Sequence, residues 1–305
     1  MKMIDDRSSW RGVYAATLTP LRADESLDEE ACAALTDRLL SEGQAGLYIT
    51  GGTGEEYAID DQVRVALYPL AMKAARGRGR IIAHVGGVPT RRALRLLKAA
   101  CDSGVDAVSA LVPHGGRYDF DELLDYYRVL AAESSVPLLG YHIPAVTRYD
   151  LSLDELSAVL ELPNVAGLKF TSSDFYLLER LRRRFPSRLL FAGRDEMLLS
   201  GLAAGADGAI GTSYNLVGAQ AVELVRCFDA GDLAGALSQQ GRINGFLEAF
   251  RGCPHHMRAI KLLAAEEFGW ECAVSPAPGQ MPTSESIEPL RRAFRAAGEP
   301  ASSRT

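Results

Sequence analysis

The feature of this sequence that most restricts its fold is a regular alternation of short apolar runs with longer amphipathic stretches. Most of the runs are followed by 10–16 residues with apolar side chains at helical spacing. The runs cover residues 12–20, 46–50, 80–86, 106–113, 137–144, 165–171, 188–193 and 207–212. Strands that alternate with helices predict a parallel sheet. Eight such units favour a closed (β/α)8 TIM barrel over an open doubly wound sheet.

The strand pattern stops near Asn215, and residues 215–298 show the spacing of three or four helices. We therefore expect a (β/α)8 barrel over residues 1–214 and a C-terminal helical extension over residues 215–305. The extension is expected to pack on the barrel as one structural unit. The last residues, GEPASSRT, are expected to form a frayed tail.

Composition excludes several classes of protein. The chain of 305 residues is 47% hydrophobic and 24% charged with a net charge of −6, which excludes disordered, collagen-like and coiled-coil chains and gives no basic footprint for nucleic acid. No run of about 18 apolar residues is present, so we expect no membrane span. Five scattered cysteines without CxxC spacing, and an N-terminus without an apolar signal segment, favour a cytoplasmic protein with reduced thiols.

Lys169 is the first candidate catalytic residue. It lies near the end of the sixth apolar run, VAGLKFT, and the carboxyl end of a barrel strand places its side chains in the active site. A lysine among apolar neighbours has a lowered pKa and becomes a nucleophile that forms a Schiff base with carbonyl compounds. The alternative is a buried lysine held by an ion pair.

Tyr141 lies at the end of the fifth run, in YHIP. A tyrosine at a strand end is a candidate proton shuttle, and a core aromatic with a satisfied hydroxyl is an equal alternative. His142 alternates to the opposite face and is expected to pack.

Two loops carry further candidates. The segment TGGTGEE after the second run offers backbone N–H groups around Gly52 and the hydroxyl of Thr53, a possible nest for a carboxylate, although a plain tight turn is the default. After the seventh run, Asp195 and Glu196 are either ordinary acids at a helix N-terminus or acceptors for substrate hydroxyls. The spacing of Cys253, His255 and His256 matches no standard metal site, so no metal is expected.

Six segments of the chain together resemble the N-acetylneuraminate lyase and dihydrodipicolinate synthase family. They are GLYITGGTGE, AHVGG, DAVSALVP, YHIP, GLKFTSSDFY and GRDEMLLSGLAAGADGAIGTSYN. The resemblance runs from about Gly12 to Asn215 and continues more weakly through HMRAIKLL. It implies a class I, pyruvate-dependent aldolase that uses no cofactor and binds its substrate covalently as a Schiff base. Lys169 then forms that base, Tyr141 shuttles the proton, and Gly52 with Thr53 holds the pyruvate carboxylate.

The resemblance is closer to the N-acetylneuraminate lyase branch. Val146 stands where the synthases carry an arginine for the aldehyde's carboxylate. The polyhydroxylated chain of a 2-oxo-3-deoxy sugar acid, first of all N-acetylneuraminate, would be bound by Thr171, Gly193, Asp195, Glu196 and Thr212. Met257 aligns with an aromatic residue beside the sugar pocket.

Two departures keep other substrates open. Gly52 replaces a hydroxyl residue of the family's carboxylate nest, and PHGGRY replaces the strand-four tyrosine that reaches a neighbouring subunit, with His114 or Tyr118 as stand-ins. A related sugar-acid dehydratase or aldolase, or a hydratase-aldolase on a bulkier 2-oxo acid, is the first alternative. A non-catalytic sugar-acid sensor on the same fold is the second. The resemblance also implies a homotetramer built as a pair of dimers.

Overall fold

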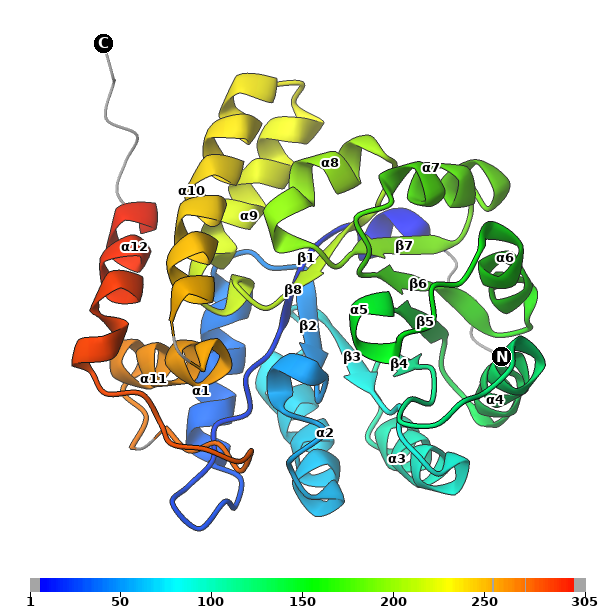
Figure 1. Cartoon of the computed structure of the whole chain (residues 1–305), viewed down its shortest axis with the longest axis horizontal. Helices are drawn as coiled ribbons and strands as arrows, with labels where there is room; N and C mark the ends of the chain where they lie inside the picture. The colour runs from blue at the N-terminus through cyan, green and yellow to red at the C-terminus, as the bar shows by residue number, and fades with distance from the viewer. Residues whose placement is uncertain (1–5, 254, 272, 299–305) are drawn as a thin grey trace.

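The computed structural model describes residues 6–253, 255–271 and 273–298. In this part of the chain eight parallel strands close into a barrel, in which each strand pairs with its neighbours in sequence and β1 pairs with β8 (Figure 1). The strands are β1 (Gly12–Ala16), β2 (Gly46–Ile49), β3 (Arg80–His84), β4 (Ala107–Leu111), β5 (Leu138–His142), β6 (Val165–Phe170), β7 (Leu189–Ala192) and β8 (Gly208–Gly211). The (β/α)8 prediction is therefore confirmed.

Helices connect the strands on the outside of the barrel. They are α1 (Glu29–Ser41), α2 (Asp61–Ala75), α3 (Thr90–Asp102), α4 (Phe120–Glu133), the short α5 (Pro144–Thr147), α6 (Leu153–Glu161), α7 (Phe175–Arg184) and α8 (Leu198–Ala203). Short 3-10 turns precede or interrupt them at Arg7–Trp10, Gly52–Gly54 and Asp195–Met197. Capping boxes begin α4 at Asp119 and α6 at Ser152, where each side chain accepts a hydrogen bond from the backbone three residues on.

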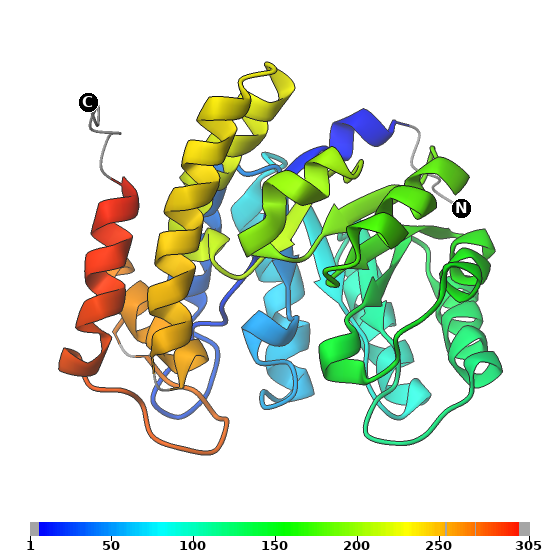
Figure 2. The ribbon, with the colours of Figure 1, turned by 45° about the horizontal axis from the view of Figure 1, so that its top comes forward.

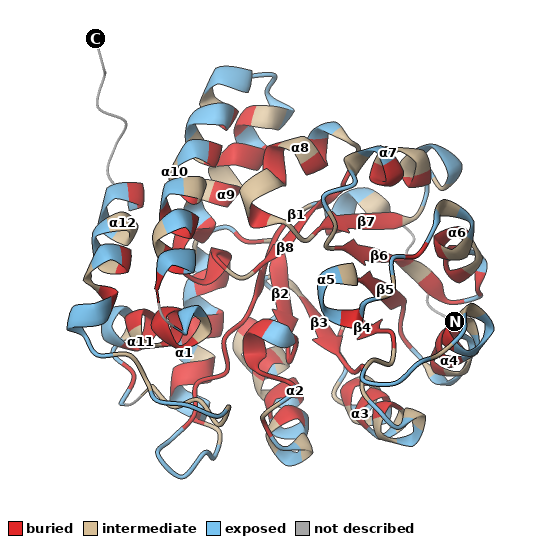
Figure 3. Ribbon diagram, viewed as in Figure 1, coloured by how far each residue is buried: buried red, intermediate tan, exposed pale blue. Residues whose placement is uncertain are grey.

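The core divides into two layers because side chains alternate across each strand. An outer cluster fills the space between the strands and the helices. An inner cluster fills the barrel itself and includes Tyr14, Tyr48, Tyr141 and Phe191. Figure 3 shows the strands as the buried centre of the molecule. The predicted strands are longer than the observed ones. Residues such as Thr17 and Leu18 follow the end of β1 and form the loops of the barrel mouth.

The predicted helices after residue 215 are present as α9 (Tyr214–Asp229), α10 (Leu233–Gly252), α11 (His256–Phe268) and α12 (Glu288–Gly298), with a 3-10 turn at Glu285–Ile287. α9 packs against β1, α10 packs on α9, and α12 lies along α10, so these helices stand on one side of the barrel (Figure 2). The division of the chain at residue 214 stays a prediction. The predicted tail, apart from Gly298, lies outside the described residues.

Candidate active site

Lys169 lies inside the barrel near the carboxyl end of β6. Only 5% of the residue is exposed. Its Nζ lies 4.0 Å from the ring centroid of Tyr48 and 4.4 Å from that of Tyr141. Two aromatic rings from β2 and β5 therefore form the wall around the amine, as the apolar run VAGLKF led us to expect for its surroundings.

Burial lowers the pKa of Lys169 to about 7, and the nearby carboxylate of Asp195 opposes this shift only in part. No ion pair to Lys169 is found within the described ranges of the chain. The buried, ion-paired lysine that was the alternative for Lys169 exists elsewhere: it is Lys261, whose Nζ lies 2.6 Å from Glu55 Oε2. A substantial fraction of the Lys169 amine is therefore neutral at physiological pH and able to act as a nucleophile.

Tyr141 is the register partner of Lys169 across the β5–β6 ladder. Burial raises the pKa of its phenol to about 12, so the hydroxyl keeps its proton at neutral pH. His142, the next residue, stacks on Phe170 with 5.2 Å between ring centroids, outside the inner cluster. The packing role expected for His142 matches this position.

Tyr48 and His84 also lie beside this pair, and neither was assigned a role from the sequence. Tyr48 donates a hydrogen bond to Ser109 Oγ at 3.2 Å, which fixes its ring beneath the lysine. The buried His84 lies edge-on to Tyr141 and accepts from the N–H of Leu111 through Nε2, at 3.3 Å. Burial holds the pKa of His84 well below its usual range, so its ring is neutral. The sequence signal for His84 was its place at the end of the third apolar run, in AHVGG, which predicts a position near the barrel mouth.

The glycine-rich loop after β2 forms a 3-10 turn that brings Thr53 to the β8 loop. The hydroxyls of Thr53 and Thr212 lie 2.7 Å apart. The amide of Asn215 donates to the carbonyl of Thr212 at 2.8 Å and to that of Ala16 at 2.7 Å, so it fixes the β8 loop against β1. Gly52 is exposed, with open space where a Cβ would stand. Asn215, predicted only as the end of the strand pattern, thus orients one of the candidate binding residues.

Thr171 and Gly193 follow β6 and β7 and lie against each other. A Cβ at Gly193 would collide with the hydroxyl of Thr171, and a Cβ at Gly211 would collide with the carboxylate of Asp195. Both glycines therefore leave room for a polar side chain at the barrel mouth. No spacing rule could have predicted either close approach.

Asp195 is buried and does not cap the helix that follows it. Its Oδ2 accepts from the backbone N–H of Ser213 at 2.8 Å and from the Ser213 hydroxyl at 2.7 Å, which links the β7 and β8 loops. Burial raises its pKa. Glu196 pairs with Arg251 of α10 at 2.7 Å and more loosely with Arg194 at 3.5 Å. The helix-cap alternative is thus wrong for Asp195, and both acids already have protein partners.

The loops after β4 and β5 enclose a cavity of about 630 Å³, lined by His114, Gly115, Gly116, Arg117 and residues 146–149. Tyr118 donates its backbone N–H to the hydroxyl of Tyr149 at 2.8 Å, which ties the two loops together. Val146, on α5 beside this cavity, is 52% exposed. Met257 borders a smaller cavity of about 130 Å³ together with Glu55, Tyr57 and Ser275.

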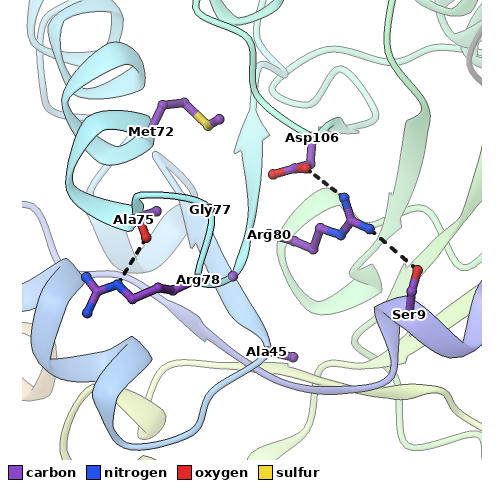
Figure 4. Close-up of a pocket in the computed structure, with 9 residues that line it drawn as sticks. Ser9, Ala45, Met72, Ala75, Gly77, Arg78, Arg80 and Asp106 are labelled. Carbon is purple, nitrogen blue, oxygen red and sulfur yellow. Dashed lines mark hydrogen bonds and ion pairs between the residues drawn. The ribbon is translucent and has the colours of Figure 1, made fainter.

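Another hollow of about 430 Å³ lies at the opposite end of the barrel, where β3 begins (Figure 4). Arg80 donates to Asp106 at 3.0 Å and its guanidinium lies over the ring of Trp10, while Arg78 donates to the carbonyl of Ala75 at 3.1 Å. Both arginines of this hollow are thus engaged by other groups of the protein. In addition, (β/α)8 active sites lie at the other end of the strands. This hollow is a less suitable place for catalysis than the surroundings of Lys169.

The part of the chain that the structure describes contains neither a metal-binding cluster nor a membrane-spanning helix. There, no three His, Cys, Asp or Glu side chains gather in an arrangement that could hold a metal ion. None of the described helices is both long and apolar enough to cross a membrane. In RLRRRF, Arg183 and Arg184 pair with acids on the surface, whereas Arg182 turns inward and pairs with the buried Asp207 at 2.6 Å.

A buried amine with a lowered pKa, next to a phenol at the carboxyl end of a (β/α)8 barrel, defines the class of protein: a lyase of the class I aldolase type. The model of the dihydrodipicolinate synthetase family matches residues 9–290. An N-acetylneuraminate lyase of Escherichia coli is 36% identical over 270 residues, which are 85% of this chain and 91% of that protein. One of Rhizobium meliloti is 42% identical over 78% of this chain and 79% of its own length.

A solved structure of CdNal from Clostridium difficile, in complex with mannosamine, is also similar. It has a TM-score of 0.89 and 32% identity, and the likeness covers 94% of this chain and 99% of that one. The chain belongs to the dihydrodipicolinate synthetase family. The resemblance seen in the sequence is thereby confirmed.

Proposed function

We propose that this protein is an N-acetylneuraminate lyase, which cleaves N-acetylneuraminate into pyruvate and N-acetylmannosamine. The observation that carries the proposal is the amine of Lys169, buried against Tyr48 and Tyr141 with its pKa lowered to about 7. The names of the relatives from Escherichia coli and Rhizobium meliloti support the choice of substrate.

In the proposed reaction the amine of Lys169 adds to the ketone carbon of the open-chain sugar acid, and loss of water leaves an iminium ion. The bond between the third and fourth substrate carbons then breaks, and its electron pair moves toward the iminium nitrogen to give an enamine. The proton of the hydroxyl on the fourth carbon passes to the oxygen of Tyr141 as that phenol gives its own proton to the substrate carboxylate. Protonation of the enamine and hydrolysis of the resulting imine release pyruvate.

Gly52 and Thr53 are the proposed ligands of the substrate carboxylate, and the bond between Thr53 and Thr212 supports a fixed position for them. Thr171, Gly193, Asp195, Glu196 and Thr212 are proposed to bind the hydroxylated chain. Asp195 has one carboxylate oxygen engaged by Ser213, so its other oxygen is the proposed acceptor. Glu196 would accept hydrogen bonds from substrate hydroxyls, while the ion pair with Arg251 holds its carboxylate in place.

The proposal includes no metal and no organic cofactor, because the iminium group itself withdraws the electron pair. Activity is expected to survive exhaustive treatment with a chelator.

We also propose a homotetramer in the cytoplasm, with no nucleic acid or membrane among its partners. The four free cysteines at the described positions 32, 101, 227 and 253 fit a reducing compartment. Analytical ultracentrifugation tests the assembly.

The function is tested by incubating the purified protein with N-acetylneuraminate and identifying both products by mass spectrometry. Equimolar pyruvate and N-acetylmannosamine support the proposal. Release of water without pyruvate would instead identify a sugar-acid dehydratase. Turnover only with bulkier aldehydes in the reverse direction would identify a hydratase-aldolase, which the glycine-lined cavity of about 630 Å³ would suit. Binding of the sugar acid without any turnover would identify a sensor.

A further inference from the structure

A buried ion pair connects the helices beyond the barrel with the glycine-rich loop. Lys261 on α11 lies 2.6 Å from Glu55 Oε2, and their side chains are 1% and 5% exposed. The hydroxyl of Ser275 donates to the other oxygen of the same carboxylate. Both oxygens of Glu55 are thus bound by groups that come from beyond the barrel strands.

Glu55 ends the turn that carries Gly52 and Thr53. Its backbone is left-handed, with φ of 59°, and its N–H donates to the carbonyl of Gly52 at 3.1 Å. Residues other than glycine rarely adopt this conformation, and a glycine or asparagine would fit the turn better. A glutamate at this position is therefore explained by what its carboxylate binds, not by the turn.

The partners of Glu55 are themselves fixed. Arg258, on the same helix as Lys261, donates to the carbonyls of Ala277 and Pro278 and so holds the segment of Ser275 against α11. On the other side of the turn, the hydroxyl of Thr53 meets that of Thr212. The turn is thus held from α11 on one side and from the β8 loop on the other.

The energetics favour a positioning role over a stabilising one. Removing two charges from water costs more than most buried pairs regain, and an apolar pair of similar volume is often at least as stable. What a buried pair with defined geometry does supply is one fixed arrangement of the two segments. Lys261 thus has a carboxylate partner within the buried region, which Lys169 lacks in the part of the chain that the structure describes.

We propose that Glu55 and Lys261 are positioning residues that fix the Gly52–Thr53 turn for the carboxylate of the 2-oxo acid, so that α11 sets the affinity for pyruvate. This inference rests on the proposed role of Gly52 and Thr53 in the preceding section. Neither Glu55 nor Lys261 touches the reacting atoms in this account.

The test uses the full-length protein and measures borohydride trapping of pyruvate as a function of pyruvate concentration. Lys261→Met and the doubly neutral variant E55Q/K261M are expected to raise the half-saturating concentration about tenfold, because a small displacement of binding groups has effects of this size. The trapping rate at saturation and its pH profile are expected to stay unchanged, since Lys169 keeps its surroundings. Ser275→Ala, the mildest change, is expected to raise half-saturation about two- to threefold.

Arg182→Met is the matched control, because the pair of Arg182 with Asp207 is also largely buried but lies at the opposite end of the barrel. It is expected to lower the unfolding temperature and leave half-saturation unchanged. If Ser275→Ala and the double variant also leave half-saturation unchanged, the positioning role is overturned and the pair is structural. If the unmodified protein forms no adduct at all, the proposed function itself fails, which is a separate result.

Discussion

Tyr141 and Lys169 are register partners on adjacent parallel strands, and the Lys169 amine lies 4.4 Å from the centre of the Tyr141 ring. The two groups are shifted in opposite senses by the same burial: the amine toward its neutral form, with a pKa of about 7, and the phenol toward its protonated form, with a pKa of about 12. At neutral pH the site therefore presents a nucleophile and a proton donor side by side.

The rate of imine formation is expected to depend on pH through Lys169. Only the neutral amine attacks a ketone, so below a pKa of about 7 the rate should fall about tenfold for each pH unit. Borohydride trapping of pyruvate at subsaturating concentration, measured between pH 5.5 and 9, checks this. A rate that still rises about tenfold per unit between pH 8 and 9 would show that the lysine keeps an ordinary pKa.

Tyr141→Phe is expected to separate imine formation from bond cleavage. Without the phenol, the hydroxyl proton of the substrate has no shuttle, and kcat for cleavage should fall about 10²- to 10⁴-fold. Trapping of pyruvate should continue, because Lys169 remains buried. Tyr149→Phe is a control, since its hydroxyl only joins the β4 and β5 loops. Equal losses in both variants would argue against a special role for Tyr141.

Thr53→Val is expected to weaken binding of the 2-oxo acid. The change removes a hydroxyl that meets Thr212 at 2.7 Å, and losing about 1 kcal/mol corresponds to about a fivefold rise in KM for pyruvate. Thr36→Val is the matched control, because its buried hydroxyl bonds to the carbonyl of Cys32 within α1. Isothermal titration with pyruvate and the KM for pyruvate are measured for both variants. An unchanged KM in Thr53→Val would remove Thr53 from the carboxylate site.

Glu196→Gln tests the part of the site that binds the sugar chain. KM for N-acetylneuraminate is expected to rise severalfold, whereas trapping of pyruvate should be unaffected, because pyruvate lacks the hydroxylated chain. Glu179→Gln, which loses a surface pair with Arg183, serves as the control. If Glu196→Gln lowers only the unfolding temperature, the pair with Arg251 is structural and Glu196 binds no substrate.

Lys169→Met is expected to stabilise the fold while abolishing activity. The native lysine has a folded pKa of about 7 and an unfolded value near 10.5, so its unfavourable burial is fully present below pH 7 and disappears as the pH rises toward 10.5. The gain in unfolding free energy should therefore be on the order of a few kcal/mol at pH 6–7 and shrink at pH 9–10. Denaturant unfolding at these pH values measures it. A gain that grows with pH would contradict the assigned shift.

The fold and part of the site could be predicted from local sequence. The alternation of apolar runs and helical stretches determines the barrel, and VAGLKF already indicates an apolar environment for Lys169. The strand ends could not be predicted, because the apolar character continues beyond Ala16 after the ladder ends.

The contacts that orient the site lie beyond any local pattern. Glu55 and Lys261 are 206 residues apart, and Asn215 binds Ala16 across 199 residues. Each partner looks ordinary in its own segment, and only the closure of the barrel and the return of α11 bring them together. Tyr48 was missed for the same reason: its role depends on the lysine that β6 places above its ring.

The central claim is that Lys169 forms an imine with a 2-oxo acid, and trapping followed by peptide mapping tests it most directly. The protein is incubated with pyruvate, reduced with sodium borohydride, and analysed by intact mass and by digestion. The account predicts one reduced pyruvyl adduct per chain, on Lys169, and no adduct on Lys261, whose amine is buried against the carboxylate of Glu55. A folded protein that carries no adduct, or carries it on another lysine, would contradict the account.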